Sequence, residues 1–315
     1  MSSASTVAKR GRGISVQRRR MSARTEESVA GVLFASPFLI GLLLFTVVPV
    51  LGSIYYSFCN YPIVSSPSWI GLRNFSEMFT NDPQFNTSIY NTLYMVVLGV
   101  PAGMLSGLAI ALLMNQKVKG LAIIRTVYYM PSQIAGVALA LLWGWLLNPQ
   151  FGVVSNALYL IGVKAPLWLG DPNWVKPSFI LMGLWGVGGA MIIWLAGLQS
   201  IPESLYEAAQ VDGATRWITF WKITLPLLSP TTFFVLTTSI IGTFQIFTQA
   251  FVLTSGGPAD ASLFYALYLY NQAFQFFRMG YASAMAWVLF VIIMIVTLIQ
   301  LKLAQSWVYY EAVKE

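Results

Sequence analysis

"SLYEAAQVDGATRWITFWKITLPLLSP", residues 204–230, places charged residues between two long apolar runs, in a chain where charges are scarce. Only 9% of the 315 residues are charged and 57% are hydrophobic, whereas a soluble domain carries roughly 25% charged residues. This composition indicates a membrane protein. It also raises the question of why a charged segment with its own turn signals is kept between membrane spans.

Six apolar runs have the length of about 20 residues that a helix needs to cross the hydrocarbon core. They lie near residues 31–56, 91–114, 126–147, 178–198, 231–253 and 281–301, and none contains Asp, Glu, Lys or Arg. We therefore predict an all-α polytopic membrane protein with six transmembrane helices. The first run is longer than the apolar core of a signal peptide and no small-residue cleavage site follows it, so we expect it to remain as an anchor.

Lysine and arginine are distributed unequally between the two sides that these runs define. The N-terminal tail, the segment after the second run, the segment after the fourth and the C-terminal end hold fourteen of them, and the opposite side holds four. Positively charged loops stay on the cytoplasmic side, so we expect both termini and the segment at 204–230 to be cytoplasmic. A seventh span at 151–170 would bury Lys164 and reverse this order, so we predict a short amphipathic outer helix there.

The predicted division of the chain is a basic, disordered cytoplasmic tail (1–28), a six-helix transmembrane domain (29–305) and a cytoplasmic C-terminal tail (306–315). The net charge of +7 lies largely in the first tail. It therefore favours a topology anchor near anionic lipid over binding to nucleic acid.

Several kinds of chemistry are excluded by what the sequence lacks. The chain has no histidine and one cysteine, Cys59, so we predict no internal disulfide and no metal site built from these ligands. No phosphate-binding loop occurs, so any ATP that drives the process must be bound by another subunit. Proton-driven carriers and ion channels commonly place ionisable groups inside the membrane; the runs contain none, although sodium coupling through backbone carbonyls stays open.

A translocation path through these runs would be neutral, polar and aromatic. The candidate lining residues are Gln245, Gln249, Asn271, Gln272, Trp185, Trp194, Phe244 and Phe247. Gln245 and Gln249 are spaced one helical turn apart and would share a face, where they could bind a sugar or polyol or could only join helices by hydrogen bonds. Small residues such as Gly99, Gly103 and Gly107 predict close helix packing. Pro37, Pro49, Pro101 and Pro131 predict kinks and freed carbonyl groups.

The segment at 202–226 is predicted to form two short helices, and we call it the helical hairpin. Ser204 and Glu207 match a capping box that starts the first helix, and Gly213 is free to take the positive φ that ends it. A second helix is expected from Ala214 to about Ile223, stopped by Pro226. Such a knob could lie on the lipid surface or dock into a groove of a cytosolic partner.

The residues "EAAQVDGA" (207–214) resemble the coupling-loop signature of permease subunits in binding-protein-dependent ABC importers. The signature positions are Glu207, Ala208, Ala209, Asp212, Gly213 and Ala214. Further stretches occur in the order seen in the carbohydrate-uptake branch: "NTLYMVVLGVPAGMLSGLAIALLMN", "RTVYYMPS", "WLGDPNW", "FVLTSGGPA" and "GYASAMAWVLF". The chain is most similar to the first permease subunit of the maltose and glycerol-3-phosphate type, over about residues 31–303.

The resemblance implies a type I importer permease fold with a cytoplasmic coupling helix between spans four and five. It implies these partners: a second permease, two cytosolic ATPase subunits that hold ATP and Mg²⁺, and an extracytoplasmic solute-binding protein, in a bacterial or archaeal cytoplasmic membrane. The implied cargo is a di- or oligosaccharide, a polyol or a glycerol phosphate, and the chain itself needs no cofactor and is not an enzyme. A stand-alone secondary carrier for a neutral solute is the alternative; a membrane-embedded enzyme would need reactive groups that the spans lack.

Overall fold

A computed structural model describes residues 23–116 and 118–309 of the chain. The chain divides into two compact units, Met1–Gly52 and Ser53–Glu315, which are described separately. Most of the predicted tail 1–28 lies outside the described residues, and helix already begins at Ala23. The predicted C-terminal tail overlaps the end of the last helix, which runs to Trp307.

The first apolar run is a continuous helix. It consists of α1 (Ala23–Leu42), the π-helical segment η1 (Leu43–Val47) and α2 (Val48–Ser57), and its stretch Ala30–Ser57 is long and apolar enough to cross a membrane. Pro37 lies inside α1 and removes the amide that would bond to the carbonyl of Leu33. The Ser36 hydroxyl donates to that carbonyl at 2.7 Å, so the freed group has a partner.

Three further helices of the second unit have the length and composition of membrane spans, which confirms the second, fifth and sixth runs as apolar spans. The first of them, Pro83–Met114, joins α4 (Pro83–Tyr94), η2 (Met95–Gly99) and α5 (Val100–Met114). The next, Ser229–Leu253, contains α14 (Ser229–Phe244) and α15 (Thr248–Leu253), and the last is α17 (Met279–Trp307).

Prolines are accommodated by a recurring device. The π-helical segments η1 and η2 each end two residues before a proline, Pro49 and Pro101. In each, the residue that follows the π segment donates to a carbonyl five residues back, instead of four. A π turn widens the helix locally, which gives the proline ring room and lets the helix continue.

The fourth run is bent. It forms α9 (Val175–Trp185) and α10 (Gly188–Gln199), which meet at 49° and together have the composition of one broken span. At the bend, a Cβ on Gly188 would lie 2.4 Å from the carbonyl oxygen of Tyr128. The backbones of the two segments therefore touch at a point where only glycine fits.

The third run is not one helix. It forms α6 (Leu121–Tyr129), the 3₁₀ segment η3 (Met130–Gln133) and α7 (Gly136–Leu146), with extended backbone at Ile134. Pro131 disfavours a helical residue before it and lacks a donor, and no π segment relieves it. Residues 23–116 and 118–309 thus contain four spans by helix length, or five with the bent pair, and the predicted count of six is not confirmed.

Short elements surround these helices. Strands β1 (Cys59–Asn60) and β2 (Ser68–Trp69) pair antiparallel and precede α3 (Arg73–Thr80). Helix α8 (Val153–Leu160) has only eight residues, which confirms a short helix in place of a seventh span. Helix α16 (Tyr265–Tyr270) continues into η5 (Asn271–Gln275).

One carboxylate joins three of these elements. Asp82 caps α4 by accepting the amide of Phe85 at 3.0 Å. Its other oxygen accepts the hydroxyl of Tyr268 in α16, at 2.6 Å, and that of Tyr281 in α17. Burial, and next the bond to Asp82, raise the pKa of Tyr268, so this hydroxyl keeps its proton and stays a donor.

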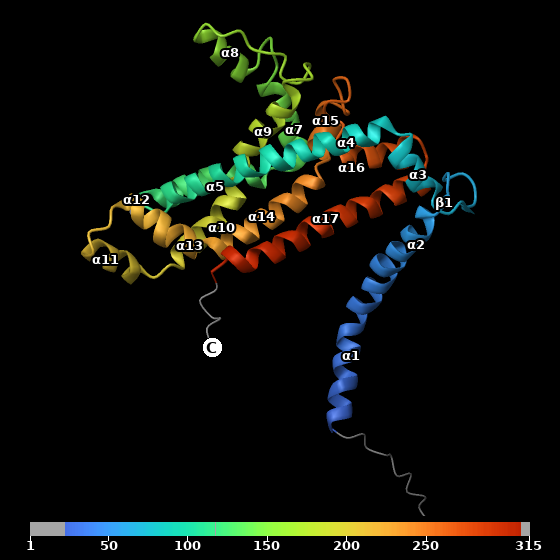
Figure 1. Ribbon diagram of the computed structural model, residues 1–315, viewed down its shortest axis with the longest axis horizontal. Coiled ribbons are helices and arrows are strands. Elements are labelled where there is room, and N and C mark those ends of the chain that lie inside the picture. Colours follow the sequence, from blue (N-terminus) through green and yellow to red (C-terminus); the bar gives the residue numbers. More distant parts are fainter. Residues whose placement is uncertain (1–22, 117, 310–315) are drawn as a thin grey trace, which may run out of the picture. The chain divides into compact units, whose positions relative to one another are not determined.

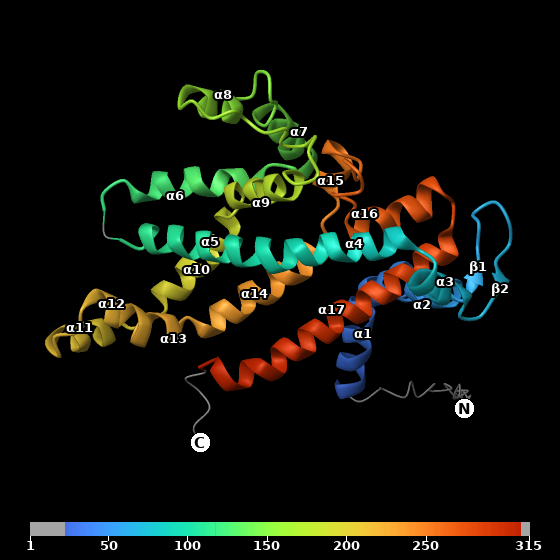
Figure 2. The same ribbon diagram turned by 45° about the horizontal axis from the view of Figure 1, so that its top comes forward.

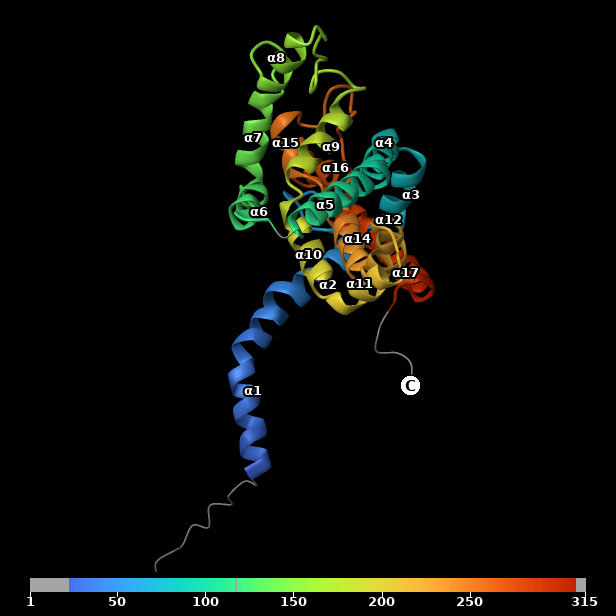
Figure 3. The same cartoon turned by 90° about the vertical axis from the view of Figure 1, so that its left-hand side faces the viewer.

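The helical hairpin consists of α11 (Glu203–Val211), α12 (Arg216–Thr219), η4 (Phe220–Thr224) and α13 (Leu225–Leu227). It lies at one end of α5 and α14, whereas the β1–β2 ribbon and α3 lie near the starts of α4 and α17 (Figures 1 and 2). Figure 3, seen from the hairpin end, shows α6, α7 and α8 as a column along one side of the unit.

Two hydrophobic clusters hold the second unit together. The larger one joins α4, α9, α16 and α17 around Phe85, Phe264 and Tyr265. The smaller one joins α5, α10 and the start of α14 around Trp194, which is 1% exposed. Trp194 lies against Gly107 of α5, where a Cβ would be 3.5 Å from its ring, so the predicted packing role of the glycines is confirmed at Gly107.

Gly188→Ala is expected to lower the stability of the protein, because its Cβ would overlap a backbone oxygen that cannot move alone. Overpacking of this kind costs about 1–3 kcal/mol. Gly189→Ala is the matched control, since a Cβ there meets nothing within 4 Å. Thermal unfolding of both variants in detergent, followed by size-exclusion fluorescence, measures the difference; equal transition temperatures would contradict the close contact at Gly188.

Candidate functional site

The first helix of the helical hairpin begins two residues earlier than the predicted capping box at Ser204 implies. Its N-cap is Pro202, without a side-chain cap bond, and Glu203 is its first residue. Ser204 therefore lies inside the first turn with a helical backbone, and the predicted capping box with Glu207 is wrong. Glu203 lies near the positive end of the helix dipole, where a carboxylate is stabilising.

The turn of the helical hairpin agrees with the prediction. Gly213 has φ +74°, the left-handed conformation that ends a helix. The amide of Ala214 donates to the carbonyl of Ala209 at 2.9 Å, and the amide of Gly213 donates to that of Gln210 at 3.1 Å. These two bonds are a Schellman motif, which satisfies the last carbonyl groups of α11 and fixes the direction in which the chain leaves it.

The second helix is longer than predicted. It is capped by Thr215, whose hydroxyl accepts the amide of Ile218 at 3.4 Å, and it continues through Pro226 to Leu227. The prediction that Pro226 stops it is wrong for the reason seen in the spans. The π segment η4 ends two residues before this proline, and Leu225 donates to the carbonyl of Phe220.

The two arms of the helical hairpin are tied at their base. The hydroxyls of Tyr206 and Thr224 lie 3.1 Å apart, within hydrogen-bond distance, and Thr224 is buried. Between the arms lies a groove of about 390 Å³ whose lining includes Glu207, Gln210 and Arg216. The hairpin is therefore a braced unit with a polar groove.

The signature residues present one exposed helix end. Glu207, Ala208, Asp212 and Gly213 are exposed, Ala214 is half-buried and Ala209 is buried. Val211, at the tip of α11, is 87% exposed. A small, exposed, acidic helix held by a fixed turn can enter a groove on another protein with little loss of conformational entropy.

A cavity of about 460 Å³ lies between the long helices, at the bend of α9 and α10. Its walls come from η2 and α5, from the segment around Pro131, from the bend, and from α14 with Gln249 of α15. None of the described residues that line it is ionisable. The cavity is therefore neutral, as predicted for a path through these runs.

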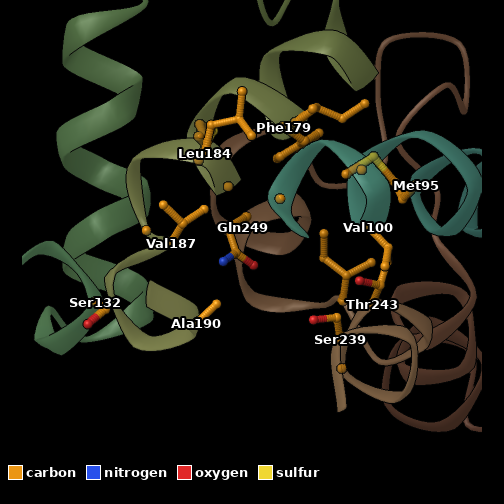
Figure 4. A pocket seen from close by; sticks show the side chains of 18 of the residues that line it. Met95, Val100, Ser132, Phe179, Leu184, Val187, Ala190, Ser239, Thr243 and Gln249 are labelled. Carbon is orange, nitrogen blue, oxygen red and sulfur yellow. The ribbon is translucent and has the colours of Figure 1, made fainter. Parts of the chain in front are cut away.

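Glycines and a few hydroxyl groups shape this cavity. Gly103 and Gly183 line it and would meet nothing within 4 Å if they carried a Cβ, so the missing side chains leave open space. Polar groups come from Ser132, Ser239 and Thr243, and Figure 4 shows the side chain of Gln249 within the same cavity. These groups can donate and accept hydrogen bonds without presenting a charge.

Only one of the predicted path residues in the block at 244–249 reaches the cavity. Gln249 lines it, whereas Gln245 is exposed and is not among the lining residues. The reason is a break in the helix: α14 ends at Phe244, and α15 begins at Thr248. Gln245 and Gln249 therefore do not share a continuous helical face, and this part of the prediction is wrong.

The predicted aromatic residues lie outside this cavity. Phe244 is in the core, Phe247 stacks on Phe251 with ring centres 5.2 Å apart, and Trp185 lines a separate cavity of about 320 Å³. Trp194 is buried in the smaller cluster. Gln272 donates to the hydroxyl of Tyr268 at 2.7 Å.

Sequence reasoning missed the serine and threonine residues of the cavity. Ser132, Ser239 and Thr243 are common residues within apolar runs, and nothing in their spacing distinguishes them from helix-packing residues. The glycines of the second and fourth runs were a usable signal. Their spacing predicts packing contacts, whereas at Gly103 and Gly183 the absence of a side chain leaves the open space of the cavity.

A bundle of membrane-crossing helices with a neutral internal cavity and a braced helical hairpin at one end defines a subunit of a membrane transporter. The chain belongs to the family described as "Binding-protein-dependent transport system inner membrane component", which it matches over residues 99–308. Chains of this family are permease subunits of ABC transporters, in which a separate ATPase hydrolyses ATP, so this chain is not an enzyme.

Relatives of known name support this assignment. The chain is 44% identical to the "Probable ABC transporter permease protein YesP" of Bacillus subtilis, over 97% of this chain and 99% of that one. It is 33% identical to the "Sulfoquinovosyl glycerol transport system permease protein SmoG" of Agrobacterium fabrum, over 89% and 92% of the two chains.

A solved structure has the same fold. A chain of a bacterial alginate ABC transporter, in complex with its alginate pentasaccharide-bound periplasmic protein, superposes with a TM-score of 0.79. The two chains are 28% identical, and the match covers 90% of this chain and 97% of that one. The fold is thus that of an ABC importer permease that works with a solute-binding protein.

The placement of the two glutamines leads to different expectations for them. Gln249→Ala should lower the transport rate, because it removes a hydrogen-bonding group from the cavity, where a lost bond is worth about 1 kcal/mol or roughly fivefold. Gln245→Ala, outside the cavity, should leave transport unchanged. Uptake into proteoliposomes that contain the full complex measures both; an equal effect of the two substitutions would contradict the placement of Gln249 in the path.

Proposed function

We propose that this chain is the first permease subunit of an ATP-driven importer for a sugar or related polyol. The printed names of several relatives support this cargo: sulfoquinovosyl glycerol, arabinooligosaccharides, lactose and products of starch degradation. The neutral cavity with three hydroxyl groups and one amide suits a solute that carries many hydroxyl groups. Such groups exchange water for protein hydrogen bonds without the large cost of burying a charge.

The partners follow from the same proposal. A second, similar permease completes the translocation path, a solute-binding protein delivers the sugar on the outer side, and two ATPase subunits bind ATP and Mg²⁺ in the cytosol. The excess of lysine and arginine on one side supports cytoplasmic placement of both termini and of the helical hairpin. The membrane is the cytoplasmic membrane of a bacterium or archaeon.

The observation that carries the proposal is the form of α11. It is an exposed acidic helix with an alanine pair, closed by a Schellman turn and tied at its base to η4. A rigid helix of this kind transmits force along its axis without bending. In the proposed mechanism the exposed residues Glu207, Ala208, Asp212 and Gly213 form the surface that docks into a cleft of the ATPase subunit. Ala209 and Ala214 are joined by the hydrogen bond that closes the turn behind this surface.

Transport then follows alternating access. Closure of the two ATPase subunits around ATP moves the two hairpins toward one another and opens the cavity to the outer side, and hydrolysis reverses the change. The coupling free energy is the difference between the binding free energies of ATP to the transporter in its two states, with the cavity open to the inner or to the outer side. In this chain, the bend between α9 and α10 and the break between α14 and α15 both contribute lining residues to the cavity, such as Val187 and Ile246, so relative movement of the helices there would change its access.

Glu207→Lys is expected to abolish recovery of the ATPase while the second permease is still recovered, because it reverses a charge on the exposed face of α11. The measurement is a pull-down from detergent-solubilised native membranes with this chain as bait. Ser204→Ala is a matched control, since Ser204 lies in the same helix and is not a signature residue. Equal ATPase recovery with Glu207→Lys and wild type would remove α11 from the interface.

Gly213→Val tests the turn independently of charge. A β-branched residue at positive φ costs about 1–3 kcal/mol, so the Schellman turn should be lost and transport should stop, with membrane insertion unchanged. Gly213→Asn is the control, because asparagine tolerates the left-handed conformation and a Cβ at this position meets nothing within 4 Å. Full transport by the valine variant would show that the turn geometry is not needed.

A further inference from the structure

The two arms of the helical hairpin carry opposite charges. From 203 to 212 the chain has Glu203, Glu207 and Asp212 and no basic residue, and from 213 to 259 it has Arg216 and Lys222 and no acidic residue. The acidic part is α11, and both basic residues lie in the second arm. One partner surface that attracts α11 would therefore repel the second arm.

The second arm also exposes aromatic and apolar side chains. Trp217 is 70% exposed, Trp221 51% and Ile218 43%. The two indole rings contact one another in a T-shaped arrangement, with centres 5.6 Å apart, and both also pack on the ring of Phe220. Exposure of such apolar surface to water is unfavourable. Contact with a partner that covers the cluster would therefore lower the free energy.

Basic and aromatic residues are combined here as they are at a membrane surface. Arg216 and Lys222 are exposed and bracket the two tryptophans. Tryptophan prefers the headgroup region, because its ring is apolar and its N–H is polar. Lysine and arginine are attracted to the anionic lipids of the cytoplasmic leaflet, and helices that lie in the interface show this composition.

We infer that Trp217, Ile218, Trp221 and Lys222 form a surface that rests on anionic lipid headgroups, with Arg216, which is exposed and also lines the groove between the arms, at its edge. We name it the basic aromatic surface. This inference depends on the proposed function in one respect only, namely that the helical hairpin lies on the cytoplasmic side of the membrane. Both interpretations of the helical hairpin then apply, one to each arm. The second arm lies on the lipid surface, and α11 docks on the ATPase.

The arrangement has a mechanical consequence. The two arms are tied through Tyr206 and Thr224, and the second arm leads directly into α14, which lines the cavity. An anchor on the lipid limits tilting of the second arm. When the ATPase moves α11, the hairpin then rotates less than it would without the lipid contact. More of the displacement therefore reaches α14 and the cavity.

Lipid contact can be measured with a fluorescent label on the full complex in lipid nanodiscs of phosphatidylethanolamine and phosphatidylglycerol. In a Cys59→Ser background, Trp217→Cys carries bimane, and Gln210→Cys in α11 is the matched control because both sites are exposed. Lipids with brominated acyl chains should quench roughly half of the bimane emission at 217, because an interfacial side chain lies at the boundary of headgroups and acyl chains. The same lipids should leave the emission of the label at 210 unchanged. Trp221→Cys gives a second reporter if Trp217→Cys does not assemble.

The same labels separate the possible occupants. Without the ATPase subunits, the permease pair should show the same lipid quenching at 217, so failure of the ATPase to bind would leave the lipid contact intact. Emission at 217 that brominated lipid does not change would overturn the inference. In that case, a second quencher, aqueous iodide, identifies the occupant. If the ATPase protects the label at 217 from iodide, the surface contacts that subunit. If iodide quenches the label both with and without the ATPase, the surface faces solvent.

Charge is tested by Arg216→Gln combined with Lys222→Gln. Lipid quenching at 217 should fall at least severalfold in this variant, and it should also fall in wild-type nanodiscs made without phosphatidylglycerol. Quenching that neither change alters would overturn the role of anionic lipid. The pull-down of the ATPase serves as the folding control, because α11 is unchanged.

Discussion

Inside a bilayer every backbone N–H and C=O group needs a partner within the protein, and the features of this fold that matter for function depend on how that constraint is met. Where a proline interrupts a helix, either a hydroxyl takes the freed carbonyl, as Ser36 does, or a π turn widens the helix before the proline, as in η1, η2 and η4. At Pro131 neither device is present, and the run breaks there. The cavity forms next to that break and next to the bend of α9 and α10, so interruptions of regular helix shape the proposed path.

Composition and periodicity were sufficient for the helical membrane fold, the approximate positions of the spans that form single long helices and the turn at Gly213. These depend on local effects: the cost of burying charge, and the ability of glycine to adopt positive φ. They failed where two segments distant in the sequence decide the outcome. The close contact of Gly188 with Tyr128 is of this kind. The interruption between Phe244 and Thr248 was also not predicted, and it removed Gln245 from the predicted path.

The helical hairpin shows the same division in a smaller segment. Its two arms and its exposed acidic residues could be predicted, because the signature residues specify them. The bond between Tyr206 and Thr224 could not, since it depends on how the arms pack, and the π segment that carries the helix through Pro226 was also not predicted. The second arm is longer than expected, and Trp217 and Trp221, four residues apart in it, lie together on an exposed side. That surface is what separates the two roles of the hairpin, contact with lipid and contact with a protein.

The central claim is that α11 is the part of this chain that contacts the ATPase. The most direct measurement places a photo-cross-linking residue at Val211, the exposed tip of α11, and at Val153 in α8 as a control, which is also exposed. After irradiation of membranes that contain the whole transporter, the account predicts a cross-link to the ATPase subunit from 211 and none from 153. A cross-link from 211 to lipid alone, in membranes where the complex is intact, would contradict it.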